Sequence, residues 1–173
     1  MRKSLWLLAT ALFAVALMSS SAMAAVNVKS LPTATFSGAS VTLTGGNFSG
    51  LGSVPANATL TATGTVSYDC ANPQGHLSPG QNPVAAQPGT TTQGLGNADH
   101  NGRGTINDMT ATATAGPTPS AQTVGCGGSG STQWTVTNPV VTVTGAHLTI
   151  TQGGSVIFCR NYTLSGPATG TAC

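Results

Sequence analysis

The cysteines are the residues of this chain whose type and number say most about its chemistry. There are four of them, Cys70, Cys126, Cys159 and Cys173. None stands at the short spacing from another cysteine or a histidine that a zinc site requires. In an oxidising compartment, four cysteines without metal spacing indicate two disulfides, which allow three pairings.

One turn offers a candidate calcium loop. Asn97, Asp99 and Asn101 occupy alternate positions before a glycine, and Asp108 could close the loop, a spacing similar to that of an EF-hand. The first position is asparagine, however, and Gly104 stands where an aliphatic residue belongs. Asn-Gly between two strand patterns is the strongest short-range hairpin signal. We therefore predict a plain hairpin turn, with calcium binding as the lesser alternative.

The other groups that catalysis uses are scattered along the chain. The histidines are His76, His100 and His147, and the acidic side chains are Asp69, Asp99 and Asp108, because glutamate is absent. A paired-carboxylate site would need distant segments to meet. The serine-containing run 127–131 has no strand-to-helix elbow to expose a nucleophile. We expect no enzyme, no catalytic residue and no cofactor.

Threonine recurs at every second position in several segments. These segments are 59–65, 110–114, 135–137, 142–144 and 149–151. A flat array of threonine hydroxyls could bind ice or a sugar surface. Threonine is also the ordinary outward residue of a strand that has few charges available, and flat arrays normally need a fixed repeat, which this sequence lacks.

The first residues have the pattern of a signal peptide. Arg2 and Lys3 precede an apolar run over 5–18, and Ala22-Met23-Ala24 supplies the small residues of a cleavage site. A retained membrane anchor would need a longer apolar run. We expect residues 1–24 to be removed and residues 25–173 to form a single secreted domain.

The charge of that domain limits its partners. Beyond residue 24 it carries Lys29, Arg103 and Arg160 against three aspartates. Nucleic acids and anionic membranes select clustered Lys and Arg. We therefore expect no nucleic acid and, after cleavage, no membrane as a partner.

Hydrophobic periodicity predicts an all-β domain. Period-two alternation is clearest over 59–70 and recurs, in shorter form, over 33–36, 40–44, 90–92, 105–115, 134–137, 141–150 and 156–164. We expect a bulge near Asn107-Asp108 and a change of sheet at Asn138-Pro139. Between 70 and 83, prolines and glycines predict a loop. Many short strands with regular turns favour an immunoglobulin-like antiparallel β-sandwich without helices.

Two finer predictions concern the end of the chain and the disulfides. A three-residue loop at 152–154 would pair Ile150 with Val156 and bury Phe158 opposite Leu148, and we favour this register. A two-residue loop would instead bury Ile157 and Cys159 and expose Phe158. For the disulfides we favour Cys70 with Cys126, which ties the two halves together, and Cys159 with Cys173. A bridge from Cys70 to Cys159 would mean that the predicted strand faces are wrong.

A family resemblance points the same way. Cys70-Ala71-Asn72-Pro73, Pro79-Gly80-Gln81-Asn82-Pro83, Asn101-Gly102 and Trp134-Thr135 form a pattern that resembles small secreted proteins of unknown function from high-GC Gram-positive bacteria. The Ala/Thr/Gly/Ser bias, the paired cysteines and the turn 98–102 are also similar to neocarzinostatin-type apoproteins. The second resemblance implies an immunoglobulin-like sandwich that carries a small apolar ligand.

Two functions therefore stay open. The first is a non-catalytic extracellular module that is structural or binds at a surface, such as a cell surface. The second is a carrier of a small apolar ligand in a cleft between the sheets, for which an apolar pocket with a few convergent polar groups would be diagnostic.

Overall fold

The computed structural model describes residues 26–95, 102–127 and 133–173, and these residues are almost entirely β-structure without an α-helix. This confirms the all-β prediction. The described strands are β1 (Asn27–Ser30), β2 (Thr33–Ser37), β3 (Ser40–Thr44), β4 (Asn47–Ser49), β5 (Ala56–Ala71), β6 (Leu77–Pro79), β7 (Val84–Ala85), β8 (Gly89–Gly94), β9 (Gly104–Thr105), β10 (Met109–Thr112), β11 (Thr135–Gln152), β12 (Ser155–Thr163) and β13 (Thr171–Ala172).

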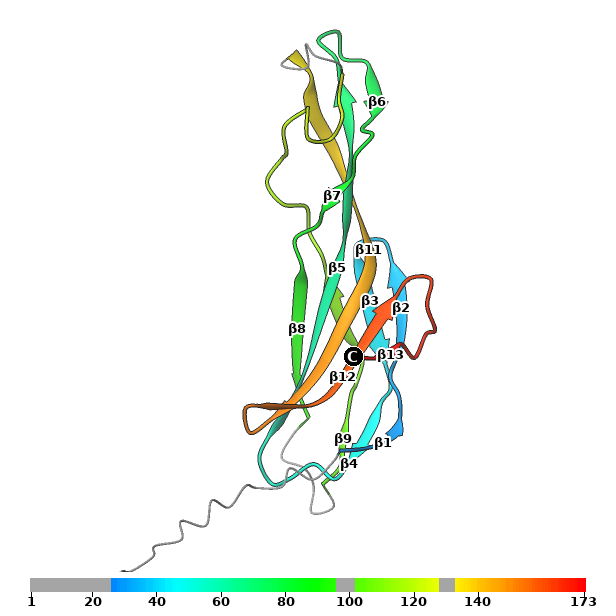
Figure 1. The fold of residues 1–173 in the computed structure, drawn as a ribbon, viewed down its shortest axis with the longest axis vertical. Coiled ribbons are helices and arrows are strands. Elements are labelled where there is room, and N and C mark those ends of the chain that lie inside the picture. Colours follow the sequence, from blue (N-terminus) through cyan, green and yellow to red (C-terminus); the bar gives the residue numbers. More distant parts are fainter. Residues whose placement is uncertain (1–25, 96–101, 128–132) are drawn as a thin grey trace, which may run out of the picture.

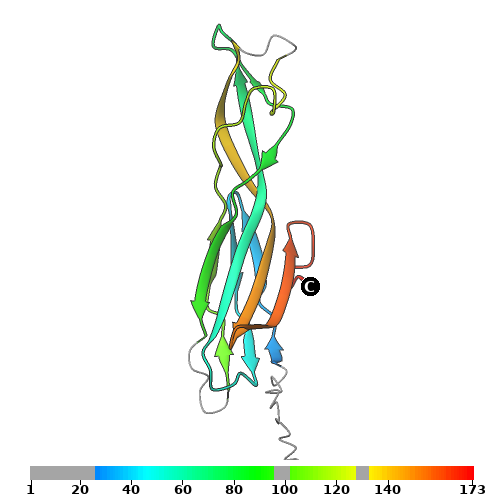
Figure 2. The same cartoon turned by 60° about the vertical axis from the view of Figure 1, so that its left-hand side comes forward.

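Two long antiparallel strands, β5 and β11, run most of the length of the molecule (Figure 1). Their register extends from Ala71 opposite Thr135 to Ala56 opposite Gln152. The alternation predicted over 59–70 is visible in β5, where every second residue from Ala56 to Ala62 is buried and Asn57 faces solvent. Strand β5 therefore has one core-facing row and one outward row along its length. The pair twists strongly, as Figure 2 shows.

The large sheet is built around this pair. Among the described strands its order is β13-β12-β11-β5, and β6, β7 and β8 pair in turn with the free edge of β5. Strand β12 pairs with β11 only from Gly145 onward. The large sheet is consequently widest in the half of the molecule that contains β8 and β12 (Figure 1).

The second layer consists of strands that are each interrupted once. One part of this layer contains β10, β3 and β2, and the other part contains β1, β4 and β9. Each strand of one part continues into a strand of the other: β1 into β2, β3 into β4 and β9 into β10. Gly45 and Gly46 turn the chain between β3 and β4 with φ of 68° and 109°. Between β9 and β10 the amide of Ile106 donates to Gly46 O at 2.9 Å. This interruption falls where the sequence predicts a bulge, and it lets both Ile106 and Met109 face the core.

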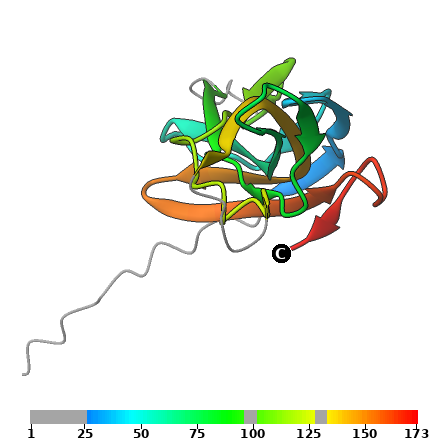
Figure 3. The same cartoon turned by 90° about the horizontal axis from the view of Figure 1, so that it is seen from above.

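Figure 3 shows the two layers from above. The core lies between them, and main-chain hydrogen bonds also join them directly. The amide of Val143 in β11 donates to Gly38 O at 2.8 Å, and that of Ala34 in β2 donates to Ala168 O at 2.8 Å. The largest fully buried side chains are Tyr162, Phe48, Leu43, Leu60, Ile106, Leu148 and Ile150. Three of the buried residues of β5 are small, Ala56, Ala58 and Ala62.

In the other half of the molecule, a disulfide and a long segment cover the sheet. Cys126 is bonded to Cys70 at the end of β5. The segment before Cys126 is held by Val124, which is fully buried and accepts a hydrogen bond from the amide of Asn82 at 3.0 Å. The Pro-Gly stretch 70–83 does form connections, but it also contributes the short edge strand β6, which pairs with the end of β5.

The predicted change of sheet at Asn138-Pro139 is wrong. Strand β11 pairs with β5 on both sides of this point, with Thr137 opposite Asp69 and Val140 opposite Ser67. Asn138 and Pro139 stand opposite the single residue Tyr68, so β11 has one extra residue and forms a bulge. Among the described non-glycine residues only Asn138 has a positive φ, of 50°. A bulge inverts the side-chain parity without moving the strand to another sheet. The Asn138 side chain donates to Asp69 Oδ2 at 2.9 Å.

The predicted three-residue loop between β11 and β12 is also wrong. Gln152 pairs with Ser155 across a two-residue turn, in which Gly153 and Gly154 have φ of 56° and 81°. These values are those of a type I′ turn. A bulge then shifts the register, so that Ile150 pairs with Phe158. The bulge turns Phe158 toward the core in spite of the shorter loop.

Candidate binding surfaces

The described residues include all four cysteines, and they form the two expected pairs. Cys70 is bonded to Cys126 with 5.4 Å between their Cα atoms, and Cys159 is bonded to Cys173 with 5.7 Å. The first bridge is buried in the narrow half of the molecule. The second lies on the outward face of β12, and Cys173 is exposed.

The calcium candidates are only partly placed. Asn97, Asp99 and Asn101 lie outside the described residues, and so does His100. Asp108 is exposed in the interruption between β9 and β10. Asp69 belongs to β5 and is engaged by Asn138.

On three adjacent strands of the second layer, β2, β3 and β10, every outward-facing residue is a serine or a threonine. We define this hydroxyl face by the residues Thr33, Thr35, Ser37, Ser40, Thr42, Thr44, Thr110 and Thr112. Cross-strand pairing aligns them in rows, with Thr42 between Thr35 and Thr110. Thr42 and Thr110 share a hydrogen bond of 2.9 Å between their hydroxyls, and Ser40 and Thr112 share one of 2.8 Å. Ordinary sheet geometry spaces these rows by about 7 Å and the strands by about 4.8 Å.

The large sheet has a less regular set of outward hydroxyls. Thr59 and Thr92 share a hydrogen bond of 3.2 Å, and Thr61 and Thr90 share one of 3.3 Å. Beyond Thr61 the same row continues on β11 and β12 with a histidine and an asparagine instead of threonine.

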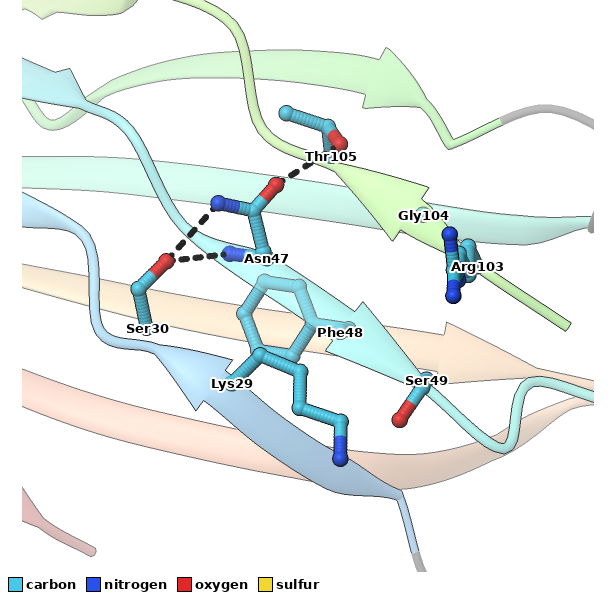
Figure 4. Close-up of a pocket in the computed structure, with 8 residues that line it drawn as sticks. All are labelled: Lys29, Ser30, Asn47, Phe48, Ser49, Arg103, Gly104 and Thr105. Atoms are coloured by element: carbon cyan, nitrogen blue, oxygen red, sulfur yellow. Dashed lines mark hydrogen bonds between the residues drawn. The ribbon is translucent and has the colours of Figure 1, made fainter.

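A groove lies where β1, β4 and β9 meet, with a volume of about 430 Å³. The buried ring of Phe48 lies at its centre, and Lys29 and Arg103 flank it (Figure 4). On one side Asn47 donates to Ser30 Oγ at 2.9 Å and accepts from Thr105 at 3.0 Å. This polar, cationic rim differs from the apolar cleft that a carrier of an apolar ligand requires.

A further cluster was not predicted from the sequence. His147 Nδ1 lies 2.7 Å from Asn161 Oδ1 and 3.8 Å from Cys173 Sγ, beside Cys159. The available signal was the β-hairpin itself. In the observed register His147 pairs with Asn161 and Cys159 with Thr149, so His147 and Cys159 are diagonal neighbours on adjacent strands.

Comparison of the chain with protein-family models and with curated proteins gives no match. Within the described ranges, no helix is long and apolar enough to cross a bilayer.

Proposed function

We propose that this chain is exported and acts outside the cell as a non-catalytic β-sandwich module that docks on a carbohydrate surface through its hydroxyl face. Export is supported by the signal-peptide pattern of residues 1–24. It is also supported by the absence of free cysteines, since disulfides persist in oxidising compartments.

The main support for docking is the alignment of hydroxyls on β2, β3 and β10. Each hydroxyl can donate and accept, so an ordered set can exchange hydrogen bonds with the hydroxyls of a polysaccharide. Neighbouring hydroxyls such as Thr42 and Thr110 already hold each other in position at 2.9 Å, which lowers the entropy lost on binding. The face offers no charge of its own to select nucleic acid or anionic lipid.

The strand order supports an immunoglobulin-like sandwich. If the interrupted strands are counted once each, the second layer consists of strands A (β1 and β2), B (β3 and β4) and E (β9 and β10). The large sheet then contains C (β5), F (β11) and G (β12), with β8 as C′ beside C. A division between A-B-E and C′-C-F-G is the arrangement of that architecture. In such a sandwich the hydroxyl face is the outer face of the A-B-E sheet.

Co-sedimentation with insoluble cellulose, chitin and peptidoglycan tests docking. The purified protein should pellet with at least one of the three. Thr42→Val with Thr110→Val removes two hydroxyls and keeps the shape of the side chains, so it should reduce the bound fraction several-fold.

The matched control is Thr59→Val with Thr92→Val, which removes a similar hydroxyl pair from the other layer and should leave binding unchanged. Equal loss in both variants would show that the hydroxyl face is not the docking surface. If the unaltered protein remains in the supernatant with all three polysaccharides, the proposed function is wrong.

A further inference from the structure

The outward face of the β11–β12 hairpin brings three metal-ligating residue types together. One imidazole nitrogen of His147 and the sulfurs of Cys159 and Cys173 lie within 4.8 Å of one another. In the oxidised protein the two sulfurs are bonded to each other, so they cannot act as thiolate ligands. Their ability to bind a metal depends on opening this bridge.

The two disulfides differ in their access to an external thiol. Cys70 and Cys126 each expose only 1 % of their surface. Cys173, in contrast, is exposed and follows the short edge strand β13, and Cys159 is only partly buried. Because exchange requires a thiolate to reach a disulfide sulfur, a dilute thiol should open the second bridge and leave the first one closed.

Other contacts hold Cys173 near Cys159 when the covalent bond is absent. Strand β13 pairs with β12 through Ala172 opposite Arg160. The Arg160 guanidinium donates to Thr169 O at 2.6 Å and to Gly170 O at 2.8 Å. Two thiolates on one tetrahedral zinc ion lie roughly 3.8 Å apart, so the sulfurs need to separate by only a small distance.

We propose that Cys159, Cys173 and His147 form a zinc site after reduction of their disulfide. Two equivalents of a thiol, RSH, convert the bridge into two cysteine thiols and release one RSSR. Zn²⁺ then binds both sulfurs and one imidazole nitrogen, and the two thiol protons are released. Three protein ligands leave the fourth position to water or an exchangeable group.

The ligand set selects the ion. Two thiolates and an imidazole suit Zn²⁺, whereas Ca²⁺ and Mg²⁺ require oxygen ligands. The nitrogen of His147 that faces the sulfurs is Nδ1, which lies 3.8 Å from Cys173 Sγ and 2.7 Å from Asn161 Oδ1. A zinc ion at this position therefore takes the lone pair of Nδ1 and replaces its contact with Asn161.

The test begins with mild thiol treatment of the purified protein, followed by alkylation and mass spectrometry. Two modified cysteines, Cys159 and Cys173, are expected. Unalkylated reduced protein is then titrated with Co²⁺ as a spectroscopic probe and with Zn²⁺ in competition. We expect one ion per chain, thiolate-to-cobalt charge-transfer absorption and displacement of Co²⁺ by Zn²⁺.

Variants separate this site from adventitious binding. His147→Gln should weaken Zn²⁺ binding by about tenfold or more, because it removes one of the three ligands. His76→Gln changes an exposed histidine in another loop and should have no effect. The proposal is overturned if both bridges open together, if no thiolate–cobalt band appears, or if His147→Gln binds as tightly as the unaltered protein.

Discussion

The ring of Phe48 in β4 meets the ring of Phe158 in β12 edge-to-face, with centroids 5.1 Å apart and planes inclined at 66°. Phe48 comes from the second layer and Phe158 from the large sheet, so this contact joins the two layers. It depends on the bulge at Ile157, which turns Phe158 inward. The register of the hairpin therefore determines how the layers pack.

The first prediction follows from this contact. Phe48 is buried to 1 % exposure, so Phe48→Ala should lower the free energy of unfolding by about 3–5 kcal/mol. Phe158→Ala should cost less, because the ring is only partly buried. Urea unfolding of both variants and of the double variant should reveal a coupling of about 0.5–1.5 kcal/mol. Val156→Ala, at a residue 60 % exposed, is the near-neutral control; additive losses would mean that the rings do not interact.

The strands were predictable where one physical signal dominates. Strand β5 has one wet face and one buried face, and this produces the alternation over 59–70. The bulges at Asn138-Pro139 and at Ile157 were not predictable with the same certainty. An inserted residue and a strand that changes sheets produce the same inversion of parity, so the sequence alone cannot distinguish them.

Among the candidate sites, too, some features were predictable from the sequence and others were not. The cysteine pairs were predictable because Cys70 ends the core-facing row of β5, whereas Cys159 was expected outside the core-facing row of its strand, within reach of the end of the chain. The closeness of His147 to Cys159 was not predictable from their positions alone, because the two residues lie 12 apart in the sequence and become neighbours only through the register of the hairpin. The hydroxyl face could not be predicted without knowing which strands are adjacent. Thr110 in β10 lies 68 residues from Thr42 in β3, and only the pairing of these strands brings the two together.

The second prediction concerns Gly64, which lies opposite Val143 beside a register shift in β11. A Cβ at this position would overlap the carbonyl oxygen of Thr142 and lie 2.8 Å from Val143 Cα. Gly64→Ala should therefore destabilise the protein by about 1–3 kcal/mol. Gly94→Ala is the matched control in a neighbouring strand, since its new Cβ would meet nothing closer than 3.7 Å. Similar midpoints in chemical denaturation would contradict the close approach.

The third prediction concerns export. Protein recovered from the culture medium of an expressing bacterium should begin at Ala25, because Ala22-Met23-Ala24 matches the cleavage pattern. N-terminal sequencing checks this directly. Recovery of the protein only from membranes, with Met1 still present, would rule out the cleavage.

The fourth prediction compares the disulfides by double substitution, which leaves no unpaired thiol. The bridge between Cys70 and Cys126 spans 56 residues and that between Cys159 and Cys173 spans 14. The chain-entropy estimate assigns them about 4 and 3 kcal/mol. Cys70→Ser with Cys126→Ser should lower the thermal midpoint more than Cys159→Ser with Cys173→Ser. If the variant without the Cys159–Cys173 bridge has the lower thermal midpoint, the half of the molecule around Cys70 and Cys126 is stable without its bridge.

The fifth prediction concerns the pH dependence of stability. Tyr162 is 1 % exposed, and its burial raises the pKa of its phenol to about 12, although nearby Arg160 lowers it in part. In the unfolded chain the pKa is about 10. Below pH 10 the phenol is neutral in both states and the stability is fully present. Between pH 10 and 12 only the unfolded chain ionises, so the folded state loses about 1.4 kcal/mol per pH unit.

Tyr162→Phe isolates this effect, because phenylalanine does not ionise. Its cost at neutral pH should be small, since the Tyr162 hydroxyl donates only a long hydrogen bond of 3.4 Å, to Pro32 O. The free energy of unfolding of both proteins is measured in urea at pH 7, 10, 11 and 12. Groups common to both cancel in the difference, which should be constant up to pH 10 and then shift by about 2–3 kcal/mol toward the variant by pH 12. A difference that stays constant over the whole range would mean that the phenol reaches solvent and ionises in the folded state.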